Sequence, residues 1–295
     1  MAINNFDVIV ETTEAEKFEI SGETVNSEIR SASISIIKKL QNYYELSGAL
    51  SVNLKSLPPR HSGFGSGTQL GLALAKSYCL HHKLNFSAWD LAKIIGRGAR
   101  SGIGIGVFEQ GGFIVDGGKS DKKNMPPIIV RKKFPENWKI LLILDLNKNG
   151  LHGNQEITAI KNLPEFDKSL SSHLCYVTLL KVLPSLSEEN FKLFASGLNE
   201  IQKIMGKYFS TLQGGSMFMS RKVADAMSYL ETEYDVALGQ SSWGPTGFAI
   251  FESEEMLLRG LHNLNMETSL KNRLKFITSD ASNIGAISKV EYLRN

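Results

Sequence analysis

Three alternating glycines, at positions 63, 65 and 67, lie among hydroxyl side chains that are suited to binding an anion. Glycine lets the backbone curl, so that successive amide groups can point at one centre. A helix predicted to begin near Thr68 adds unpaired N–H groups and the positive end of its dipole. The segment Gly63–Thr68 is therefore predicted to bind phosphate or pyrophosphate. The hydroxyls of Ser66 and Thr68 can donate hydrogen bonds to that anion or ligate a magnesium ion.

The loop does not fit the two commonest nucleotide-binding motifs. A Walker P-loop needs Lys-Ser or Lys-Thr after its last glycine, and neither pair follows Gly67. The Rossmann spacing fails at Thr68, and no acidic residue ends a following strand at the right distance. A glycine-rich turn that only caps a helix is the structural alternative, although three glycines with Ser and Thr exceed what such a turn requires.

Three motifs occur in the order found in the GHMP kinase superfamily, which includes galactokinase and the homoserine, mevalonate and phosphomevalonate kinases. The residues that resemble its central motif are Pro59, Gly63, Gly65 and Ser66. Residues 100–112 resemble its Ser-Gly-x-Asp to Gly-Gly segment, and residues 239–248 resemble its glycine-rich C-terminal motif. This resemblance implies an α+β fold with two layers. The N-terminal domain is expected to have the ribosomal protein S5 domain-2-like fold, and the C-terminal domain a ferredoxin-like fold.

The position of the catalytic aspartate in these kinases is occupied by Gly104. Where that aspartate is present, it orients or deprotonates the substrate hydroxyl. Glu109 and Asp116 are near in sequence, but neither occupies the motif position. Phosphoryl transfer is therefore disfavoured, and an ATP-dependent small-molecule kinase is kept as the alternative because some members lack this aspartate.

The amino-acid sequence of residues 61–69, 97–104 and 111–118 resembles the β-ribofuranosylaminobenzene 5'-phosphate synthase family more closely than the kinases. The resemblance implies a glycosyltransferase-type synthase that joins phosphoribosyl pyrophosphate to 4-aminobenzoate or 4-hydroxybenzoate. Carbon dioxide and pyrophosphate would be released, in the biosynthesis of a tetrahydromethanopterin-type cofactor. A magnesium ion and a homodimer are implied as well. Loss of carbon dioxide restores the aromatic ring, so the reaction needs no proton-abstracting aspartate.

This resemblance and this chemistry provide the candidate site residues. Catalytic roles are expected for His61, Arg97, Arg100 and Asp116. Phosphate or pyrophosphate binding is expected for Gly63, Gly65, Ser66, Gly67, Thr68 and Gln69. Substrate binding is expected for Ser101, Gly102, Gln240, Ser241, Ser242 and Gly244. Ser66 and Asp116 are the candidate metal ligands. Each set has a structural alternative: ion pairs for the arginines, a loop-stabilising bond for His61, and tight turns for Asp116 and residues 240–244. His152 and Glu156 either face a site or cap a helix.

The elements that must position these residues mix strands and helices without a regular βαβ rhythm, which also favours an α+β protein. Helices are predicted at 23–46, 69–82, 88–96, 157–163, 170–183, 188–205, 222–230 and 254–264, with Ser87 and Asp90 as a capping box. Strands are predicted near 6–10, 52–54, 113–115, 128–130, 140–144, 248–251 and 274–277. The turn cluster at 147–150 predicts two domains, residues 1–150 and 151–295.

Composition sets limits on the partners. The 295 residues carry a net charge of +3, which is too weak a balance to indicate nucleic acid. The longest strongly apolar run, Ile140–Leu144, is too short to cross a membrane, no secretory signal is visible, and two cysteines suit a reducing cytoplasm. Small-molecule substrates are thus expected. The first five residues resemble the interior of the superfamily's first hairpin, so we expect the chain to start late; a non-catalytic ligand-binding protein is the third hypothesis.

Overall fold

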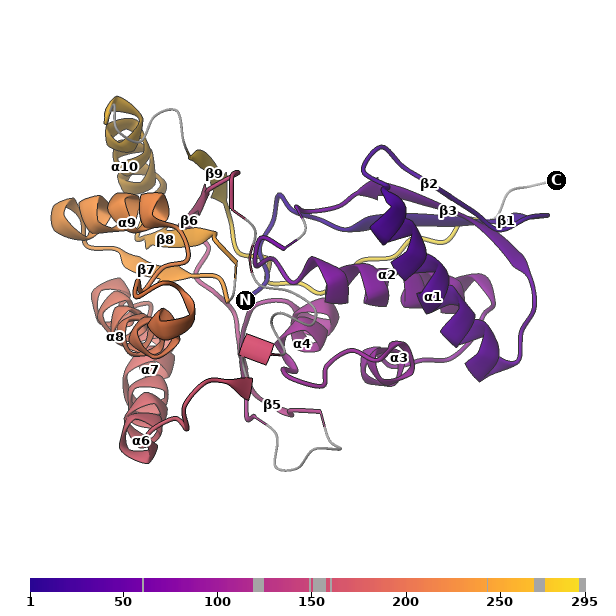
Figure 1. The fold of residues 1–295 in the computed structure, drawn as a ribbon, viewed down its shortest axis with the longest axis horizontal. Helices are drawn as coiled ribbons and strands as arrows, with labels where there is room; N and C mark the ends of the chain where they lie inside the picture. The colour runs from indigo at the N-terminus through magenta and orange to yellow at the C-terminus, as the bar shows by residue number, and fades with distance from the viewer. Residues whose placement is uncertain are drawn as a thin grey trace. The chain divides into compact units, whose positions relative to one another are not determined.

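The computed structural model describes residues 1–59, 61–118, 125–148, 150, 158–159, 161–242, 244–267 and 274–291. They form two compact units (Figure 1). Unit 1 comprises residues 1–59 and 65–133 together with the chain from Ser282; unit 2 comprises residues 60–64 and 134–281. These units do not follow the predicted division after residue 150. The chain changes units after Lys133 because the next strand pairs entirely within unit 2.

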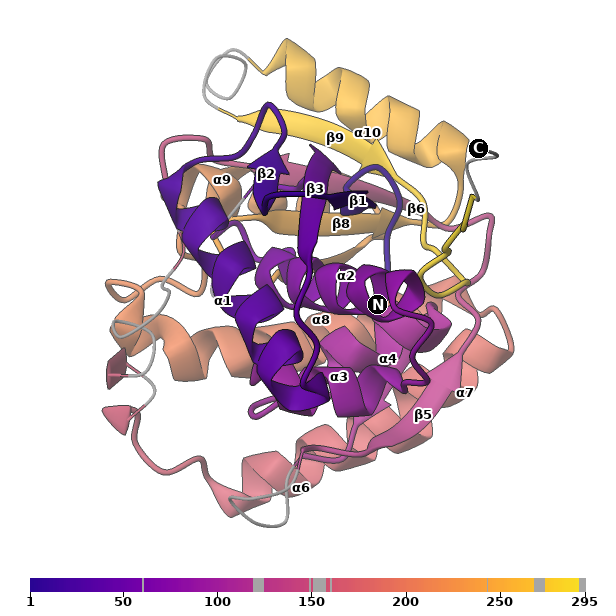
Figure 2. The ribbon, with the colours of Figure 1, turned by 90° about the vertical axis from the view of Figure 1, so that its right-hand side faces the viewer.

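Unit 1 contains a three-stranded sheet in the order β1-β3-β2 (Figure 2). The strands are β1 (Ile9–Ala15), β2 (Glu19–Ser21) and β3 (Ala49–Ser56). β1 runs antiparallel to β3, and β2 runs parallel to it. A separate antiparallel pair joins β4 (Phe113–Asp116) to β5 (Ile128–Lys132). The helices are α1 (Ser27–Tyr44), α2 (Ser66–His81), α3 (Ala88–Ile95) and α4 (Ile103–Gln110).

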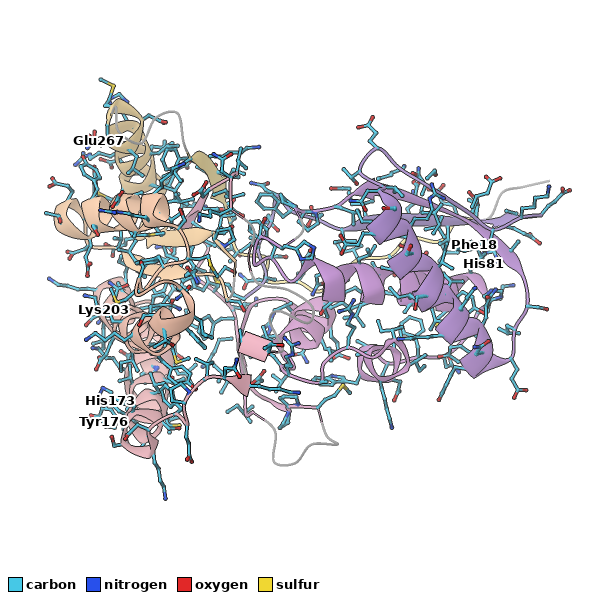
Figure 3. All side chains as sticks on the ribbon, in the orientation of Figure 1. Phe18, His81, His173, Tyr176, Lys203 and Glu267 are labelled. Atoms are coloured by element: carbon cyan, nitrogen blue, oxygen red, sulfur yellow. The ribbon has the colours of Figure 1, made fainter. Side chains whose placement is uncertain are left out.

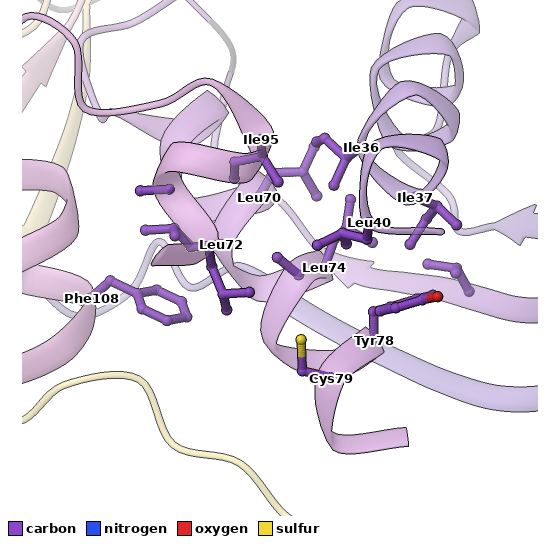
Figure 4. Packing of buried hydrophobic residues seen from close by; sticks show 14 of the residues in the cluster. Ile36, Ile37, Leu40, Leu70, Leu72, Leu74, Tyr78, Cys79, Ile95 and Phe108 are labelled. Atoms are coloured by element: carbon purple, nitrogen blue, oxygen red, sulfur yellow. The ribbon is translucent and has the colours of Figure 1, made fainter. Parts of the chain in front are cut away.

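Apolar side chains from α1, α2, α3, α4 and β3 form one core in unit 1 (Figure 4). Leu40, Leu72 and Leu74 are fully buried in it. Helix α2 packs against the three other helices and β1, so its position is fixed from several sides. The predicted cap of α3 is confirmed, because Ser87 accepts a hydrogen bond from the Asp90 amide at 3.1 Å. A well-packed α2 gives the glycine-rich loop a rigid support.

Helix α4 was not predicted from the sequence. Gly104 and Gly106 lower its intrinsic helix propensity by about 1 kcal/mol each relative to alanine. Tertiary packing offsets that cost, because Ile105 and Phe108 are buried in the core of unit 1. The first turn of this helix lies beside α2 and contributes to the candidate site.

Unit 2 has a four-stranded antiparallel sheet in the order β7-β8-β6-β9. Its strands are β6 (Lys139–Leu144), β7 (Ala237–Gln240), β8 (Gly247–Phe251) and β9 (Lys275–Ser279). Helices separate β6 from β7 and β8 from β9, while β7 and β8 are joined by a turn. This is the split βαβ arrangement of a ferredoxin-like domain. The predicted α+β class, with a ferredoxin-like second domain, is therefore confirmed.

The helices of unit 2 include one irregular run. They are α6 (Lys168–Val177), η1 (Thr178–Val182), α7 (Leu183–Ser187), α8 (Phe191–Phe209), η2 (Ser210–Leu212), α9 (Arg221–Glu233) and α10 (Glu254–Met266). The segment η1 is a π-helix within the single helix predicted at 170–183. On α6, His173 Nε2 lies 2.7 Å from Glu200 Oε1 of α8, close to the exposed ring of Tyr176 (Figure 3). Of the helix predicted at 157–163, residues 157 and 160 lie outside the described residues, and residues 158, 159 and 161 are helical.

Helix α8 supplies side chains that satisfy the backbone of the edge strand β7. Asn199 Oδ1 accepts a hydrogen bond from the Leu238 amide at 2.6 Å, and Gln202 Oε1 accepts one from the Gln240 amide at 3.1 Å. An unpaired edge would be open to pairing with another chain. These bonds also hold in place the turn that follows β7.

The chain returns to unit 1 at its C-terminal end. The Ser282 carbonyl accepts a hydrogen bond from the Gly112 amide at 2.7 Å, and the Ala286 amide donates to the Phe108 carbonyl at 2.7 Å. Residue 2 joins the same arrangement, since the Ser282 amide donates to the Ala2 carbonyl at 3.1 Å. Residues 282–286, here called the C-terminal strap, therefore bind the C-terminal end of α4 within unit 1.

Candidate functional site

In unit 1 the glycine-rich loop runs directly into α2. Gly65 is the N-cap residue and has a left-handed backbone, with φ 66° and ψ 18°. Its carbonyl accepts hydrogen bonds from the Thr68 and Gln69 amides at 3.0 and 3.2 Å. A side chain at Gly65 would meet no atom within 4 Å, so this position needs glycine for its φ angle and not for space. The helix begins at Ser66, and its first turn presents N–H groups at an exposed end.

The guanidinium group of Arg97 lies against this first turn. Its Nη2 and Nη1 atoms are 3.6 and 3.7 Å from the position that a Cβ of Gly67 would take. Its stem runs along the helix, with Cγ 3.9 Å from the corresponding position at Gly71. Arg97 directly follows Gly96, which ends α3 in a left-handed conformation. A guanidinium charge and the positive end of a helix dipole thus lie together, and both favour an anion.

Arg100, the other arginine for which a catalytic role is predicted, is exposed in the segment that leads into α4. The structure brings Arg97 to the loop through the end of α3. Sequence spacing could not show that Arg97 contacts the loop, because residues 67 and 97 are separated by most of α2 and all of α3.

Gln69 and Thr68 connect the first turn of α2 to the first turn of α4. Gln69 Nε2 donates a hydrogen bond to the Gly104 carbonyl at 2.8 Å. A Cβ on Gly104 would lie 3.0 Å from Cγ2 of Thr68 and 3.8 Å from its Oγ1. The γ-methyl of Thr68 therefore faces the bare α-carbon of Gly104. Gln69 is predicted to bind pyrophosphate. In the structure its side-chain amide nitrogen instead donates its hydrogen bond to the main chain of α4.

Asp116, Ser101 and Gly102 come together as the N-terminal cap of α4. Asp116 Oδ2 accepts hydrogen bonds from Ser101 Oγ at 2.6 Å and from the Gly102 amide at 2.9 Å. Its Oδ1 accepts a third bond from the Gly118 amide at 3.2 Å. A Cβ on Gly102 would collide with the Pro126 carbonyl oxygen. The bond to Gly118 is the turn contact given as the structural alternative for Asp116, whereas the bonds to Ser101 and Gly102 cap a helix that was not predicted. Gly102 is closely packed.

Unit 2 holds the first part of the loop. The Gly63 carbonyl accepts a hydrogen bond from Ser241 Oγ at 2.6 Å, and the His61 carbonyl accepts one from the Gly150 amide at 2.8 Å. His61 and Gly63 both have positive φ angles, 58° and 88°. A Cβ on Gly244 would collide with the backbone of Ser62. The 61–64 segment and the turn after β7 are thus fitted to each other.

That turn uses its predicted substrate-binding residues for structure. The Ser241 amide donates to the Thr246 carbonyl and the Gly244 amide to the Ser241 carbonyl, each at 3.0 Å. Gln240 Oε1 accepts from the Met219 amide at 2.6 Å, while its Nε2 donates to the Ser242 carbonyl at 3.0 Å. Ser242 is exposed with φ 52°. Among these residues, Ser242 presents the most open side chain.

Sequence reasoning missed Asp145, which is 4% exposed at the end of β6. Its Oδ2 accepts a hydrogen bond from Ser220 Oγ at 2.7 Å, and its Oδ1 accepts one from the Asn147 amide at 3.1 Å. Ser220 is in turn the N-cap of α9. The available signal was an acidic residue placed directly after the most apolar strand. His152 and Glu156 lie outside the described residues.

No cluster of three or more His, Cys, Asp or Glu side chains is arranged to hold a metal ion in the described parts of the chain. Within the same parts, no helix is long and apolar enough to cross a membrane. Asp116 fits a metal poorly in this arrangement, since both of its oxygens already accept protein hydrogen bonds. A metal ion at this site would have to draw most of its oxygen ligands from a phosphate-bearing substrate.

Comparison with known proteins places these features in a family. Residues 31–112 match the family described as GHMP kinases N terminal domain. A beta-ribofuranosylphenol 5'-phosphate synthase from Methanocaldococcus jannaschii is 32% identical over 256 residues, covering 81% of this chain and 74% of that protein. The protein of the same name from Archaeoglobus fulgidus is 30% identical, covering 86% and 79%. The one from Methanothermobacter thermautotrophicus is 36% identical over 161 residues, and this match spans about half of its length, 49%.

Solved structures share the fold at low sequence identity. Mevalonate diphosphate decarboxylase from Staphylococcus aureus superposes with a TM-score of 0.69 at 14% identity, covering 96% of this chain and 86% of that one. Homoserine kinase from Cytophaga hutchinsonii superposes with a TM-score of 0.67 at 14% identity, covering 96% and 89%. These similarities confirm the predicted GHMP-kinase-like fold and carry no information on the reaction.

Proposed function

The chain belongs to the family of the beta-ribofuranosylphenol 5'-phosphate synthases, and from this premise we propose that it transfers a phosphoribosyl group to a hydroxybenzoate. The observation that carries the proposal is the guanidinium of Arg97 at the N-terminus of α2, where the Gly65 carbonyl closes the first turn. An arginine fork and main-chain amides are the groups that stabilise a leaving pyrophosphate.

In the proposed reaction, the bond between the anomeric carbon and pyrophosphate breaks, and pyrophosphate leaves with the electron pair. Positive charge develops on the ribose while negative charge develops on the leaving group. The ring carbon that bears the carboxylate then forms the new carbon–carbon bond. Its bond to the carboxylate breaks, carbon dioxide leaves, and the released electron pair restores the aromatic ring. Atoms and charge balance without a proton transfer.

Arg97 and the first turn of α2 act on the leaving group in this scheme. The negative charge on pyrophosphate grows as the bond breaks, so interactions with it are stronger in the transition state than in the ground state. Gly104 fits the same scheme, because no step requires a carboxylate base at that position. Magnesium is proposed to arrive with the pyrophosphate oxygens, with Ser66 as its protein ligand.

The name of the relatives bears on the identity of the acceptor. Their product is a ribofuranosylphenol 5'-phosphate, which contains a phenol ring and a ribose phosphate. Of the two acceptors expected from the sequence, 4-hydroxybenzoate leaves a phenol after loss of carbon dioxide, whereas 4-aminobenzoate leaves an aniline. We therefore propose 4-hydroxybenzoate. A role in making a tetrahydromethanopterin-type cofactor and a homodimer are proposed on the family resemblance alone, and a cytoplasmic location is proposed from the low cysteine content.

The test supplies carboxyl-labelled 4-hydroxybenzoate with phosphoribosyl pyrophosphate and magnesium, and measures released carbon dioxide. Arg97→Ala should lower kcat/KM by about 100-fold, because such transition-state interactions contribute about 3 kcal/mol. Arg97→Lys should retain part of the activity, since it keeps the charge and loses the planar fork. The matched control is Arg259→Ala, on the exposed face of α10, which should behave like the wild type.

Two parallel reactions decide between the hypotheses. Replacing the labelled substrate with 4-aminobenzoate measures the acceptor preference directly. ATP with a small alcohol, followed by ADP formation, measures the kinase alternative. No carbon dioxide from either benzoate, together with steady ADP formation, would show that the synthase proposal is wrong.

A further inference from the structure

The contact between Thr68 and Gly104 brings two helix starts together in unit 1. Thr68 lies in the first turn of α2, and Gly104 lies in the first turn of α4. The nearest Thr68 atom to the glycine's missing side chain is the methyl Cγ2, at 3.0 Å, whereas the hydroxyl Oγ1 is 3.8 Å away. The methyl group therefore occupies the space beside Gly104, and the hydroxyl is turned from it.

We propose that Gly104 is a positioning residue: its bare α-carbon leaves room for the Thr68 methyl group, so that the Thr68 hydroxyl can face pyrophosphate at the start of α2. This inference rests on the proposed function and assigns the group by which Thr68 recognises its substrate. Arg97 lies against Gly67 in the same first turn as Thr68, and helix side chains tilt toward the N-terminus, so a guanidinium and a hydroxyl would both reach an anion bound there. The Thr68 amide is already bonded to the Gly65 carbonyl at 3.0 Å, which leaves the hydroxyl as the donor that Thr68 can offer.

Gln69 holds the two helices at the separation that this contact requires. Its Nε2 donates to the Gly104 carbonyl at 2.8 Å, on the residue that receives the Thr68 methyl group. A bridge from α2 to the backbone of α4 therefore fixes the approach of Thr68 to Gly104. The tightness of the contact means that a larger residue at position 104 would require Thr68 to move. Any Cβ would press on the threonine methyl at a distance that neighbouring atoms rarely tolerate.

The roles of the Thr68 hydroxyl and of the Thr68 methyl group can be distinguished by substitutions at positions 68 and 104. Gly104→Ala pushes on the methyl group and should rotate or displace Thr68. Thr68→Ser keeps the hydroxyl and removes the methyl, so it should relieve the clash that Gly104→Ala creates. Thr68→Val keeps the shape of threonine and removes the donor. A purely structural role would make valine the better substitute, whereas a role in binding makes serine the better one.

The experiment measures binding of inorganic pyrophosphate with magnesium by isothermal titration calorimetry. We expect Gly104→Ala and Thr68→Val each to raise Kd by about tenfold, which is about 1.4 kcal/mol. Thr68→Ser alone, and Thr68→Ser combined with Gly104→Ala, should stay within about threefold of the wild type. Ile103→Ala, at the exposed start of α4, is the matched control and should bind like the wild type.

Melting temperatures separate folding from binding. Alanine is a better helix former than glycine, so Gly104→Ala should remain folded while it loses affinity. Wild-type affinity in Thr68→Val, a double variant as weak as Gly104→Ala, or a wild type that does not bind pyrophosphate would each overturn the inference. If the wild type binds pyrophosphate and shows this pattern but releases no carbon dioxide, the proposed reaction fails and the assignment of Thr68 stands. If the wild type releases carbon dioxide and Gly104→Ala releases it at the same rate, the proposed reaction stands and the assignment of Thr68 fails.

Discussion

At the scale of single residues, His82 has an unusual environment for an imidazole outside the candidate site. It follows the last residue of α2, and its ring centroid lies 4.4 Å from that of Tyr78. Its Nε2 is buried and has no hydrogen-bond partner among the described residues. Burial, and to a smaller degree the neighbouring charge of His81, lowers the pKa of His82 below its usual value.

From this lowered pKa we predict that the protein loses stability in acid. In the unfolded chain His82 takes up a proton near pH 6.5, while in the folded protein it stays neutral to lower pH. The unfolded state therefore binds more protons in that window, and stability falls as the pH drops below 6.5. We expect the melting temperature to be lower at about pH 5.5 than at about pH 7.5, with a smaller difference in His82→Gln. His262→Gln, on the exposed face of α10, is the control and should keep the wild-type difference.

At the scale of elements, the start of α4 depends on a cap from a distant strand. Asp116, at the end of β4, accepts bonds from Ser101 and from the Gly102 amide. A carboxylate at a helix N-terminus both satisfies orphan amides and interacts favourably with the dipole. The first turn of α4 carries Gly104, so this cap supports the contact on which the position of Thr68 depends.

Substitution of Asp116 distinguishes a cap from a catalytic or metal-binding carboxylate. We expect Asp116→Ala to lower the free energy of unfolding by about 1 kcal/mol, as measured by urea denaturation. Asp116→Asn should lose less, because its amide oxygen still accepts a hydrogen bond. If instead stability is unchanged and carbon dioxide release is abolished in both variants, the carboxylate acts on substrate or metal and the cap is incidental.

At the scale of the whole molecule, residues near the C-terminal end of the chain pack back onto unit 1. The C-terminal strap lies so close to α4 that a Cβ on Gly285 would collide with the Glu109 carbonyl oxygen. Arg131 Nη2 donates to the Asn283 carbonyl at 2.6 Å, and Lys76 Nζ donates to the Ala286 carbonyl at 2.8 Å. Side chains from α2 and β5 therefore fasten residues that follow the whole of unit 2 in the sequence.

A small change in the strap should be felt in the stability of unit 1. We expect Gly285→Ala to destabilise the protein by about 1–3 kcal/mol, the usual cost of forcing extra atoms into a packed region. Differential scanning calorimetry provides the magnitude, and hydrogen exchange should show lost protection of the α4 amides. Ile287→Ala, two residues further at a side chain that is 81% exposed, should be neutral. Equal stability of both variants would mean that the strap does not hold α4.

The sequence by itself determined the features that depend on neighbouring residues. The glycine-rich loop, the Ser87 cap and most helices of unit 2 follow from local turn chemistry, capping and hydrophobic periodicity. The order of the three motifs was sufficient to predict the superfamily, and the family comparisons confirm it. Helix α4 could not be predicted in this way, because its two glycines lower the local helix propensity and it is stabilised by burial and by contacts with distant residues.

Only the tertiary structure decided which distant groups meet. Arg97 lies against Gly67, Gln69 donates a hydrogen bond to the Gly104 carbonyl, and Asp116 caps α4. The tertiary structure also divided the predicted loop, with residues 61–64 in unit 2 and the chain from Gly65 in unit 1. Such contacts join segments separated by whole helices and strands, and their geometry depends on how the cores pack. Residue types can therefore suggest an anion site, whereas packing selects the side chains that form it.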